Sequence, residues 1–250
     1  MRRYEPMSII AVIPSRYAST RLPGKPLADI CGKPMIQHVY ERVRRAGLFD
    51  DVIVATDDGR IADAVRRFGG SVCMTSPDCP SGSDRLIEAA TAHPADIYVN
   101  VQGDEPLVEP GSIVMLARAM LDDGALQMAT LCYPVSTERA ADPNLVKVVR
   151  AHNGNALYFS RSPIPFPRSG GIPAQYFGHL GIYAYRRDLL MRFGSLPYSP
   201  LENTEKLEQL RVLQAGIAIR VLEVEAMGPG VDTPEDLEEV RRIMGSQSRG

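Results

Sequence analysis

The sequence lacks any run of 18 apolar residues, which excludes an ordinary membrane-spanning helix. Its opening, MRRYEPMSII, turns polar too early for the apolar core of a secretory signal. It also lacks an excess of charge, because 28 Lys and Arg oppose 30 Asp and Glu to give a net charge of -2. No overall basic field attracts nucleic acid or an anionic membrane. We therefore expect a cytosolic protein with neither of these partners, in which any anion-binding site is local.

Cysteines are few and scattered, at positions 31, 73, 79 and 132, so we expect reduced thiols. Cys73 and Cys79 have no nearby histidine that would complete a zinc site. No internal repeat or low-complexity linker interrupts the chain, and an apolar content of 44% is sufficient for a core. These features predict a single domain over residues 7–245, with flexible tails at 1–6 and 246–250.

Apolar runs alternate with helical periodicity through the first half of the chain. IIAVIP at 9–14, DVIVATDD at 51–58, SVCMT at 71–75 and DIYVNVQ at 96–102 are typical of strands buried on both faces. Apolar residues at helical spacing predict helices between and after them, near 36–46, 61–68, 86–93 and 113–120. The alternation predicts an α/β fold with a Rossmann-like, mostly parallel sheet flanked by helices.

The alternation of strands and helices ends at about residue 127, and a smaller β-rich subregion is expected from there to about residue 200. Four strand-like runs, MATLCYPV, LVKVVRA, ALYFSR and HLGIYAYR, follow with few helices between them. The proline-rich segment 162–175 must be a loop, and it suits a mobile flap or a subunit contact. A helix over 204–216, a strand over 219–225 and a helix over 233–244 complete the expected fold.

A basic loop follows the first strand. Arg16, Arg21 and Lys25 lie within ten residues in SRYASTRLPGKP, at the sheet edge where α/β proteins bind ligands. Arginine forks and a lysine ammonium suit phosphate oxygens, so the loop indicates a polyphosphate site. It matches neither the P-loop pattern nor the dinucleotide fingerprint. A solvated basic loop is the alternative.

Two aspartates are candidate ligands of Mg²⁺. Asp104 follows a strand in VNVQGDEP, and Asp232 lies between a glycine-containing turn and a helix in GPGVDTPEDL. Magnesium prefers one or two carboxylates together with phosphate oxygens and water. An acidic turn for Asp104 and a helix-terminal charge for Asp232 are the alternatives. The segment CPSGSDRL at 79–86 either meets a phosphate or a base with its amides, or simply caps a helix through Ser83 or Asp84.

Taken together, these stretches resemble one family, the CMP-Kdo synthetases or 3-deoxy-manno-octulosonate cytidylyltransferases. The segments that carry the resemblance include IPSRYASTRLPGKPL, NVQGDEP, ALYFSRSPIP, HLGIYAYR, SPLENTEKLEQLRVL and GVDTPEDLEEVR. They occur in order from Ile9 to about Met244. The resemblance implies a fold of the nucleotide-diphospho-sugar transferase type. It also implies that CTP and the acidic sugar Kdo give CMP-Kdo and pyrophosphate for lipopolysaccharide synthesis.

The resemblance further implies roles for individual residues. Catalysis is expected to involve Arg16, Lys25, Asp104 and Asp232. The nucleotide is expected to contact Arg16, Arg21, Lys25, Ser81, Arg85 and Gln102. Magnesium is expected at Asp104 and Asp232. The sugar is expected to contact Gln102, Arg161, His179, Tyr183, Glu208 and Gln209. Arg161 and His179 suit the sugar carboxylate. A cytoplasmic homodimer is also implied, with residues 127–200 serving sugar binding and dimerisation.

Two positions depart from the family pattern, Ser83 where threonine is frequent and Gly178 where a basic residue is common. A relative acting on 8-amino-Kdo would share most of these motifs, so the resemblance leaves the exact sugar open. A sialic acid cytidylyltransferase is the nearest other enzyme, although NVQGDEP and HLGIY favour Kdo. A noncatalytic nucleotide sensor is the alternative from another class, and it would not need both aspartates.

Overall fold

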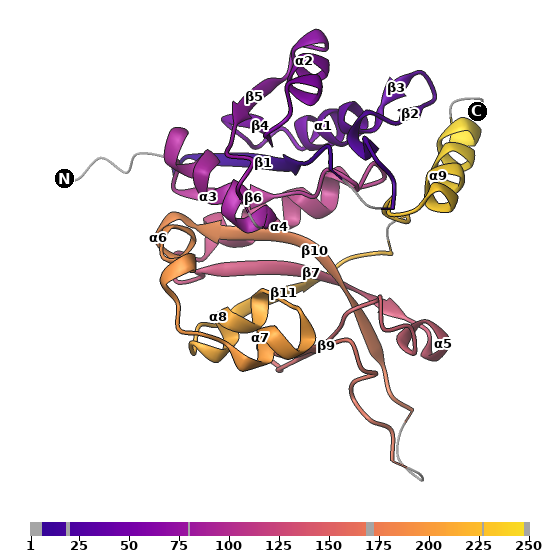
Figure 1. Cartoon of the computed structure of the whole chain (residues 1–250). Coiled ribbons are helices and arrows are strands. Elements are labelled where there is room, and N and C mark those ends of the chain that lie inside the picture. The colour runs from indigo at the N-terminus through magenta and orange to yellow at the C-terminus, as the bar shows by residue number, and fades with distance from the viewer. Residues whose placement is uncertain (1–6, 19–20, 80, 169–172, 227, 248–250) are drawn as a thin grey trace, which may run out of the picture. The chain divides into compact units, whose positions relative to one another are not determined.

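The computed structural model describes residues 7–18, 21–79, 81–168, 173–226 and 228–247 (Figure 1). The chain forms two compact units, one of residues 1–117 with 227–250 and one of residues 118–226. The expected tails at 1–6 and 248–250 lie outside the described residues. Among the residues that are described, no helix has the length and apolar character needed to cross a membrane.

Four parallel strands form the sheet of the first unit: β1 (Ile9–Ser15), β4 (Asp51–Thr56), β5 (Ser71–Met74) and β6 (Ile97–Asn100). Their order is β5-β4-β1-β6, and Val12 of β1 pairs with Ile53 on one side and Asn100 on the other. Every side chain of β1 is buried, which explains its uninterrupted apolar sequence. The predicted Rossmann-like sheet is confirmed.

Three helices of the first unit connect these strands, namely α1 (Met35–Arg45), α2 (Gly59–Arg67) and α3 (Gly82–Ala92), and α4 (Pro110–Asp122) follows β6. The chain moves outward from β1 to β4 and β5, and then returns past β1 to β6 (Figure 1). Because parallel crossovers are right-handed, α1 and α2 cover one face and α3 the other. The strand order therefore reverses between β1 and β6, which is where such sheets bind ligands.

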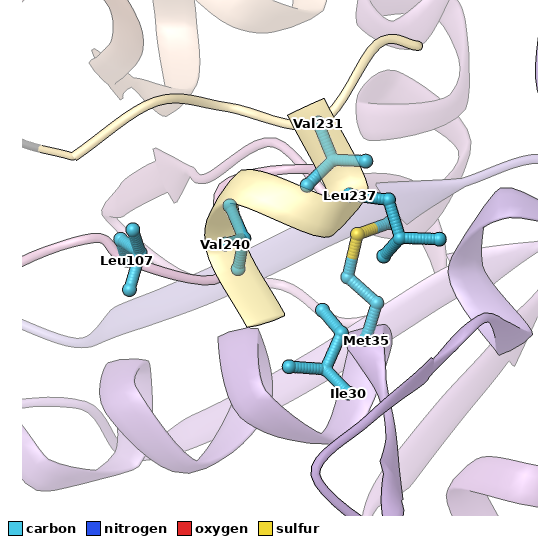
Figure 2. Close-up of a cluster of buried hydrophobic side chains, with 6 residues drawn as sticks. All are labelled: Ile30, Met35, Leu107, Val231, Leu237 and Val240. Carbon is cyan, nitrogen blue, oxygen red and sulfur yellow. The ribbon is translucent and has the colours of Figure 1, made fainter. Parts of the chain in front are cut away.

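The last helix, α9 (Pro234–Gln247), packs against the first unit through a small apolar cluster. Leu237 and Val240 of α9 lie with Met35 of α1 and Ile30, as Figure 2 shows. Ile30 belongs to a hairpin of β2 (Asp29–Ile30) and β3 (Lys33–Pro34), which the sequence patterns did not predict. The cluster fixes the segment that precedes α9, and Asp232 lies in that segment.

The second unit holds a mixed sheet of β7 (Met128–Val135), β8 (Lys147–Arg150), β9 (Ala156–Ser160), β10 (Tyr176–Arg186) and β11 (Ile219–Glu223). β7 pairs with β10 antiparallel and with β11 parallel, while β8 runs antiparallel to both β9 and β10. Short helices join them: α5 (Thr137–Ala140), α6 (Arg187–Met191), η2 (Phe193–Ser195), α7 (Pro200–Glu205) and α8 (Gln209–Gln214). The expected β-rich stretch falls in this unit. Residues 169–172 of the proline-rich segment lie outside the described residues.

Two sequence-based helix boundaries differ from the structure. The helix predicted over 204–216 is interrupted, because Lys206 adopts a left-handed conformation with φ 55° and ends α7. Leu207 and Leu210 are both buried, and their spacing imitates one continuous helix although only Leu210 lies within α8. In addition, α9 continues to Gln247, so residues 246–247 are helical rather than part of a tail.

We expect Leu237→Ala to lower the free energy of unfolding by about 2–4 kcal/mol, because it leaves a cavity beneath α9. Leu157→Ala, at a side chain that is 63% exposed, is the matched control and should change it by less than about 0.5 kcal/mol. Urea unfolding measures both values. Equal losses in the two variants would show that the cluster does not hold α9.

Candidate active site

A cavity of about 420 Å³ lies in the first unit at the carboxyl ends of β1 and β6. Its walls come from the end of β1, the basic loop, the turn after β6, the start of α3 and the segment before α9. The lining residues are Pro14, Ser15, Arg16, Ala18, Arg21, Lys25, Pro26, Gly82, Gln102, Gly103, Asp104 and Asp232. The structure thus brings together Arg16, Arg21, Lys25, Gln102, Asp104 and Asp232 of the predicted nucleotide and magnesium residues.

One ammonium group joins the two predicted magnesium ligands. Lys25 Nζ lies 2.6 Å from Asp104 Oδ2 and 3.1 Å from Asp232 Oδ1. Arg21 Nη2 lies 3.2 Å from the other oxygen of Asp232. Burial of the Lys25 ammonium opposes its charge, but the two carboxylates outweigh that effect and raise the pKa of Lys25 above its ordinary value. The side chain is therefore a permanent cation at physiological pH.

The backbone brings the two aspartates together. The amide of Val231 donates to the carbonyl of Asp104 at 2.9 Å, so the segment before α9 runs beside the turn after β6. Asp232 follows directly, and its own amide donates to Asp236 in the first turn of α9 at 3.0 Å. Thr233 and Asp236 together cap α9, since the amide of Asp236 donates to Thr233 Oγ1 at 3.2 Å and that of Thr233 donates to the Asp236 carboxylate at 2.8 Å. This leaves the Asp232 carboxylate to Lys25 and Arg21.

Glu105 is a third acidic side chain in this group. Its carboxyl lies against the backbone of Gly230, where an added Cβ would be 3.0 Å from Glu105 Oε1. Burial raises the pKa of Glu105 to about 8, and the charges of Asp104 and Asp232 add to this effect against that of Lys25. At neutral pH the Glu105 carboxyl is therefore mainly protonated, and the three basic side chains face the carboxylates of Asp104 and Asp232. Among the described residues, no three His, Cys, Asp or Glu side chains could hold a metal ion by themselves.

Gly103 is required by a close approach of two chain segments. A Cβ at this position would lie 2.4 Å from Ser15 Oγ and 2.9 Å from the carbonyl oxygen of Pro14. The turn after β6 therefore rests directly on the end of β1. Ser15 is 3% exposed, and its hydroxyl has no hydrogen-bond partner in the described part of the chain. A buried hydroxyl without a partner is costly, and at the edge of a cavity it is a candidate ligand contact.

Ser81 and Arg85 lie at the start of α3, but their side chains are engaged in the fold. Ser81 caps α3, accepting from the amide of Asp84 at 3.2 Å while its own amide donates to the Asp84 carboxylate at 3.1 Å. The N-cap is thus Ser81, Asp84 completes the capping box, and the predicted cap by Ser83 is wrong. Arg85 is 0% exposed, and its guanidinium contacts Thr75 and Asp57, which follow β5 and β4. Its Nε and Nη2 have no hydrogen-bond partner among the described residues. Gly82 is the residue of this segment that lines the cavity.

Arg161, in the second unit, is held by backbone carbonyls. Its Nε donates to the carbonyl of Glu205 at 2.8 Å and its Nη1 to that of Pro143 at 3.2 Å. Its own carbonyl accepts from the ammonium of Lys147, which is 0% exposed and also donates to the carbonyls of Asp142 and Leu145. Burial lowers the pKa of Lys147, but three carbonyl acceptors satisfy its three N–H groups. Lys147 thereby fixes the position from which Arg161 extends.

His179 and Tyr183 of β10 lie side by side in the same unit, with ring centroids 5.3 Å apart. Burial lowers the pKa of His179 to about 3, so its imidazole is neutral. Its Nε2 lies 2.9 Å from Thr130 Oγ1, whose hydroxyl proton is directed at the carbonyl of Ile182 or Leu180. Because that proton is used, Nε2 must be the donor and Nδ1 an acceptor. Such an imidazole suits a sugar hydroxyl better than a carboxylate.

Glu208 and Gln209 lie at the start of α8, which packs against β9. Glu208 lines a second cavity of about 550 Å³, together with Glu202 of α7, Lys206 between the two helices and Arg211 of α8. Gln209 is 4% exposed, and its Nε2 has no hydrogen-bond partner among the described residues. Burial and the charge of Glu208 raise the pKa of Tyr183 well above its ordinary value, so the phenol stays protonated. The Gln209 amide and the Tyr183 phenol are donors of the kind that suit a polyhydroxy ligand, but neither residue lines this cavity.

Sequence reasoning passed over three residues that shape the first cavity. Glu105 stands beside Asp104 in QGDEP, but no pattern indicates that its carboxyl is desolvated. Ser15 and Gly103 meet only because β1 and β6 are neighbours. The usual strand order at the switch point of a Rossmann-like sheet could have suggested that contact, since Ser15 ends one strand and Gly103 follows the adjacent one.

A parallel sheet with cations and carboxylates at its switch point defines an α/β protein suited to binding a polyphosphate ligand. The family model described as "Cytidylyltransferase" matches residues 10–220. The 3-deoxy-manno-octulosonate cytidylyltransferase of Escherichia coli is 55% identical over 238 residues, covering 95% of this chain and 96% of the relative. That of Myxococcus xanthus is 52% identical over 236 residues, covering 94% and 96%.

A solved structure agrees with these sequence matches. It is a CMP:2-keto-3-deoxy-manno-octonic acid synthetase complexed with CTP, with 54% identity and a TM-score of 0.94, covering 96% of this chain and 99% of that one. The chain belongs to the cytidylyltransferase family, and within it to the 3-deoxy-manno-octulosonate cytidylyltransferases. The resemblance inferred from the motifs is confirmed, as is the expected type of fold.

We expect Gly103→Ala to reduce turnover with CTP at least about tenfold, because the new methyl group would displace the turn bearing Asp104 from the end of β1. Gly111→Ala is the control, since a Cβ there meets nothing within 4 Å. Steady-state kinetics would be compared after circular dichroism shows that both variants fold. Wild-type turnover in Gly103→Ala would mean that the close contact does not position the site.

Glu105 predicts a specific pH dependence of stability. Its carboxyl has a pKa of about 8 in the folded protein and 4.5 ordinarily, so the folded state favours the protonated form. Its stabilising contribution is complete below pH 4.5 and is lost as the pH rises toward 8. Glu105→Gln cannot ionise, so the variant should gain stability over wild type progressively between pH 5 and pH 8.

Urea unfolding without nucleotide or divalent cations measures this difference. Glu109→Gln alters an exposed carboxylate that pairs with Arg42, and it should give a nearly constant difference over the same range. Parallel stability curves for wild type and Glu105→Gln would contradict the raised pKa.

Proposed function

We propose that this protein transfers the cytidylyl group of CTP to Kdo, forming CMP-Kdo and pyrophosphate for lipopolysaccharide synthesis. The observation that carries this proposal is the convergence of Lys25, Asp104 and Asp232 in a switch-point cavity of a chain from this family. The relatives' names favour Kdo as the acceptor. The 8-amino analogue of Kdo and sialic acid are the alternative acceptors, and a noncatalytic nucleotide sensor is the remote alternative.

In the proposed reaction, the anomeric hydroxyl oxygen of the sugar bonds to the α-phosphorus of CTP. The bond from that phosphorus to the oxygen bridging to the β-phosphate breaks, pyrophosphate leaves, and the hydroxyl proton passes to solvent. Negative charge grows on the phosphoryl oxygens and on the leaving group, where cations stabilise the transition state most. Arg16, Arg21 and Lys25 supply that charge from the cavity wall. No side-chain nucleophile is needed.

Asp104 and Asp232 fit a magnesium ion. Their oxygens lie close enough together to share one ammonium group, and an all-oxygen donor set completed by phosphate and water suits Mg²⁺. When bound there, magnesium would neutralise phosphate charge and lower the pKa of the attacking hydroxyl. The two carboxylates would hold the ion, and Gln102 beside them would orient substrate.

In the second unit, the sugar is proposed to contact Arg161, His179, Tyr183, Glu208 and Gln209. In support, Gln209 has a buried amide donor without a partner among the described residues, and His179 presents a neutral Nδ1 acceptor. Arg161 provides the positive charge for the sugar carboxylate. For the nucleotide, Gly82 and the amides at the start of α3 are proposed in place of direct side-chain contacts from Ser81 and Arg85. A cytoplasmic homodimer remains a prediction.

The test is a pyrophosphate-release assay with CTP, Mg²⁺ and Kdo, 8-amino-Kdo or sialic acid. We expect release with Kdo, and a loss of kcat of about a hundredfold or more in Asp104→Asn and Asp232→Asn. Asp63→Asn, at an exposed carboxylate of α2 that pairs with Arg66, is the control and should keep wild-type kcat.

The assay separates the alternatives. No release with any of the three sugars would overturn the enzymatic function and leave the nucleotide sensor. Release with 8-amino-Kdo or sialic acid alone would replace Kdo by that sugar. Near-normal kcat in a folded aspartate variant would remove that residue from the proposed metal site.

A further inference from the structure

The basic loop is attached to the rest of the first unit by an aromatic contact that lies outside the cavity. Tyr17 follows Arg16, and the guanidinium carbon of Arg60 lies 3.3 Å from the centroid of the Tyr17 ring. Arg60 belongs to the first turn of α2. Neither Tyr17 nor Arg60 lines the cavity, so both can influence a ligand there only through their neighbours.

The Arg60 guanidinium is itself held in place. Its Nε donates to Asp58 Oδ1 at 3.0 Å and its Nη2 to Asp58 Oδ2 at 2.6 Å. Asp58 is the N-cap of α2, where it also accepts from the amide of Arg60 at 2.9 Å. The amide of Asp58 donates to Thr56 at the end of β4 at 3.2 Å. A planar fork fixed at two points presents its face in a defined position.

Tyr17 in turn contacts the other end of the loop. The amide of Gly24 donates to the carbonyl of Tyr17 at 3.1 Å. Gly24 has φ 69°, and a Cβ there would lie 3.2 Å from three atoms of the Tyr17 ring and hydroxyl. Only glycine combines that conformation with that contact. Arg16 directly precedes Tyr17, and Lys25 directly follows Gly24. The contact between Tyr17 and Gly24 therefore fixes the backbone positions from which the Arg16 and Lys25 side chains reach the cavity.

We propose that Asp58, Arg60 and Tyr17 form a clamp that pre-organises the basic loop for a nucleoside triphosphate. The inference rests on the proposed function and deepens it by adding positioning residues. A loop with cations already in place loses less conformational freedom on binding, which favours affinity. Because Asp58 neutralises Arg60, the clamp acts through geometry and not by attracting the anion.

The test compares Arg60→Ala and Tyr17→Leu with Tyr17→Phe and Arg66→Ala. Loss of the exposed Arg60 cation from the half-buried Tyr17 ring should raise the KM for CTP about two- to fivefold, with kcat and the KM for sugar unchanged. Tyr17→Phe keeps the ring and should stay near wild type. Arg66→Ala removes the same charge from the same helix at an equally exposed site, and it should leave the KM for CTP unchanged.

Two further readouts separate positioning from general stability. The double variant Arg60→Ala/Tyr17→Leu should raise the KM for CTP no more than either single change, because both remove one contact. Without nucleotide, the Gly24 amide should exchange hydrogen faster in Arg60→Ala than in Arg66→Ala. Equal KM values for CTP in these two variants, or additive effects in the double variant, would overturn the clamp.

The wild-type protein distinguishes this failure from failure of the proposed function. CTP binding by calorimetry and pyrophosphate release in wild type test the function, whereas differences among the variants test the clamp. Normal wild-type catalysis with no difference between Arg60→Ala and Arg66→Ala overturns the clamp alone.

Discussion

The site depends on one ammonium group placed between two carboxylates. Lys25, Asp104 and Asp232 come from the loop after β1, the turn after β6 and the segment before α9. A half-buried cation without partners would be unfavourable, and so would two adjacent carboxylates without a cation. Each therefore stabilises the position of the others, while the hydrogen bond from Val231 to the Asp104 carbonyl and the apolar packing of α9 hold the segments in register. The ion pairs and the backbone contacts therefore stabilise the same arrangement of Lys25, Asp104 and Asp232.

Buried polar groups in the two units divide into satisfied and unsatisfied ones, and the division is informative. Lys147 uses all three of its donors on carbonyls, so it stabilises the fold and offers nothing to a ligand. Ser15 Oγ and Gln209 Nε2 are buried without partners among the described residues. Natural proteins leave few such groups, because each one costs free energy. A polar ligand that met them would recover that cost on binding.

Much of the fold could be predicted because parallel strands buried on both faces are nearly continuous apolar runs, as β1 is. The switch point then follows from alternation and right-handed crossovers, and with it the placement of the basic loop. The break at Lys206 could not be predicted, because buried leucines on both sides of it keep a helical spacing. The raised pKa of Glu105 and the neutral state of His179 were equally inaccessible, since both arise from burial by segments distant in sequence.

The basic loop presents a problem of like charges, since Arg16, Arg21 and Lys25 repel one another when no anion is bound. At its end, Lys25 is held by the two aspartates, one of which also pairs with Arg21. At its start, Tyr17 rests against Arg60, whose own charge is neutralised by Asp58 and so adds little to the repulsion. Anchors of two different kinds, ionic at one end and aromatic at the other, thus hold the cations on one wall of the cavity. The motif supplies the charges, and contacts outside the motif determine how well they are ordered before a triphosphate arrives.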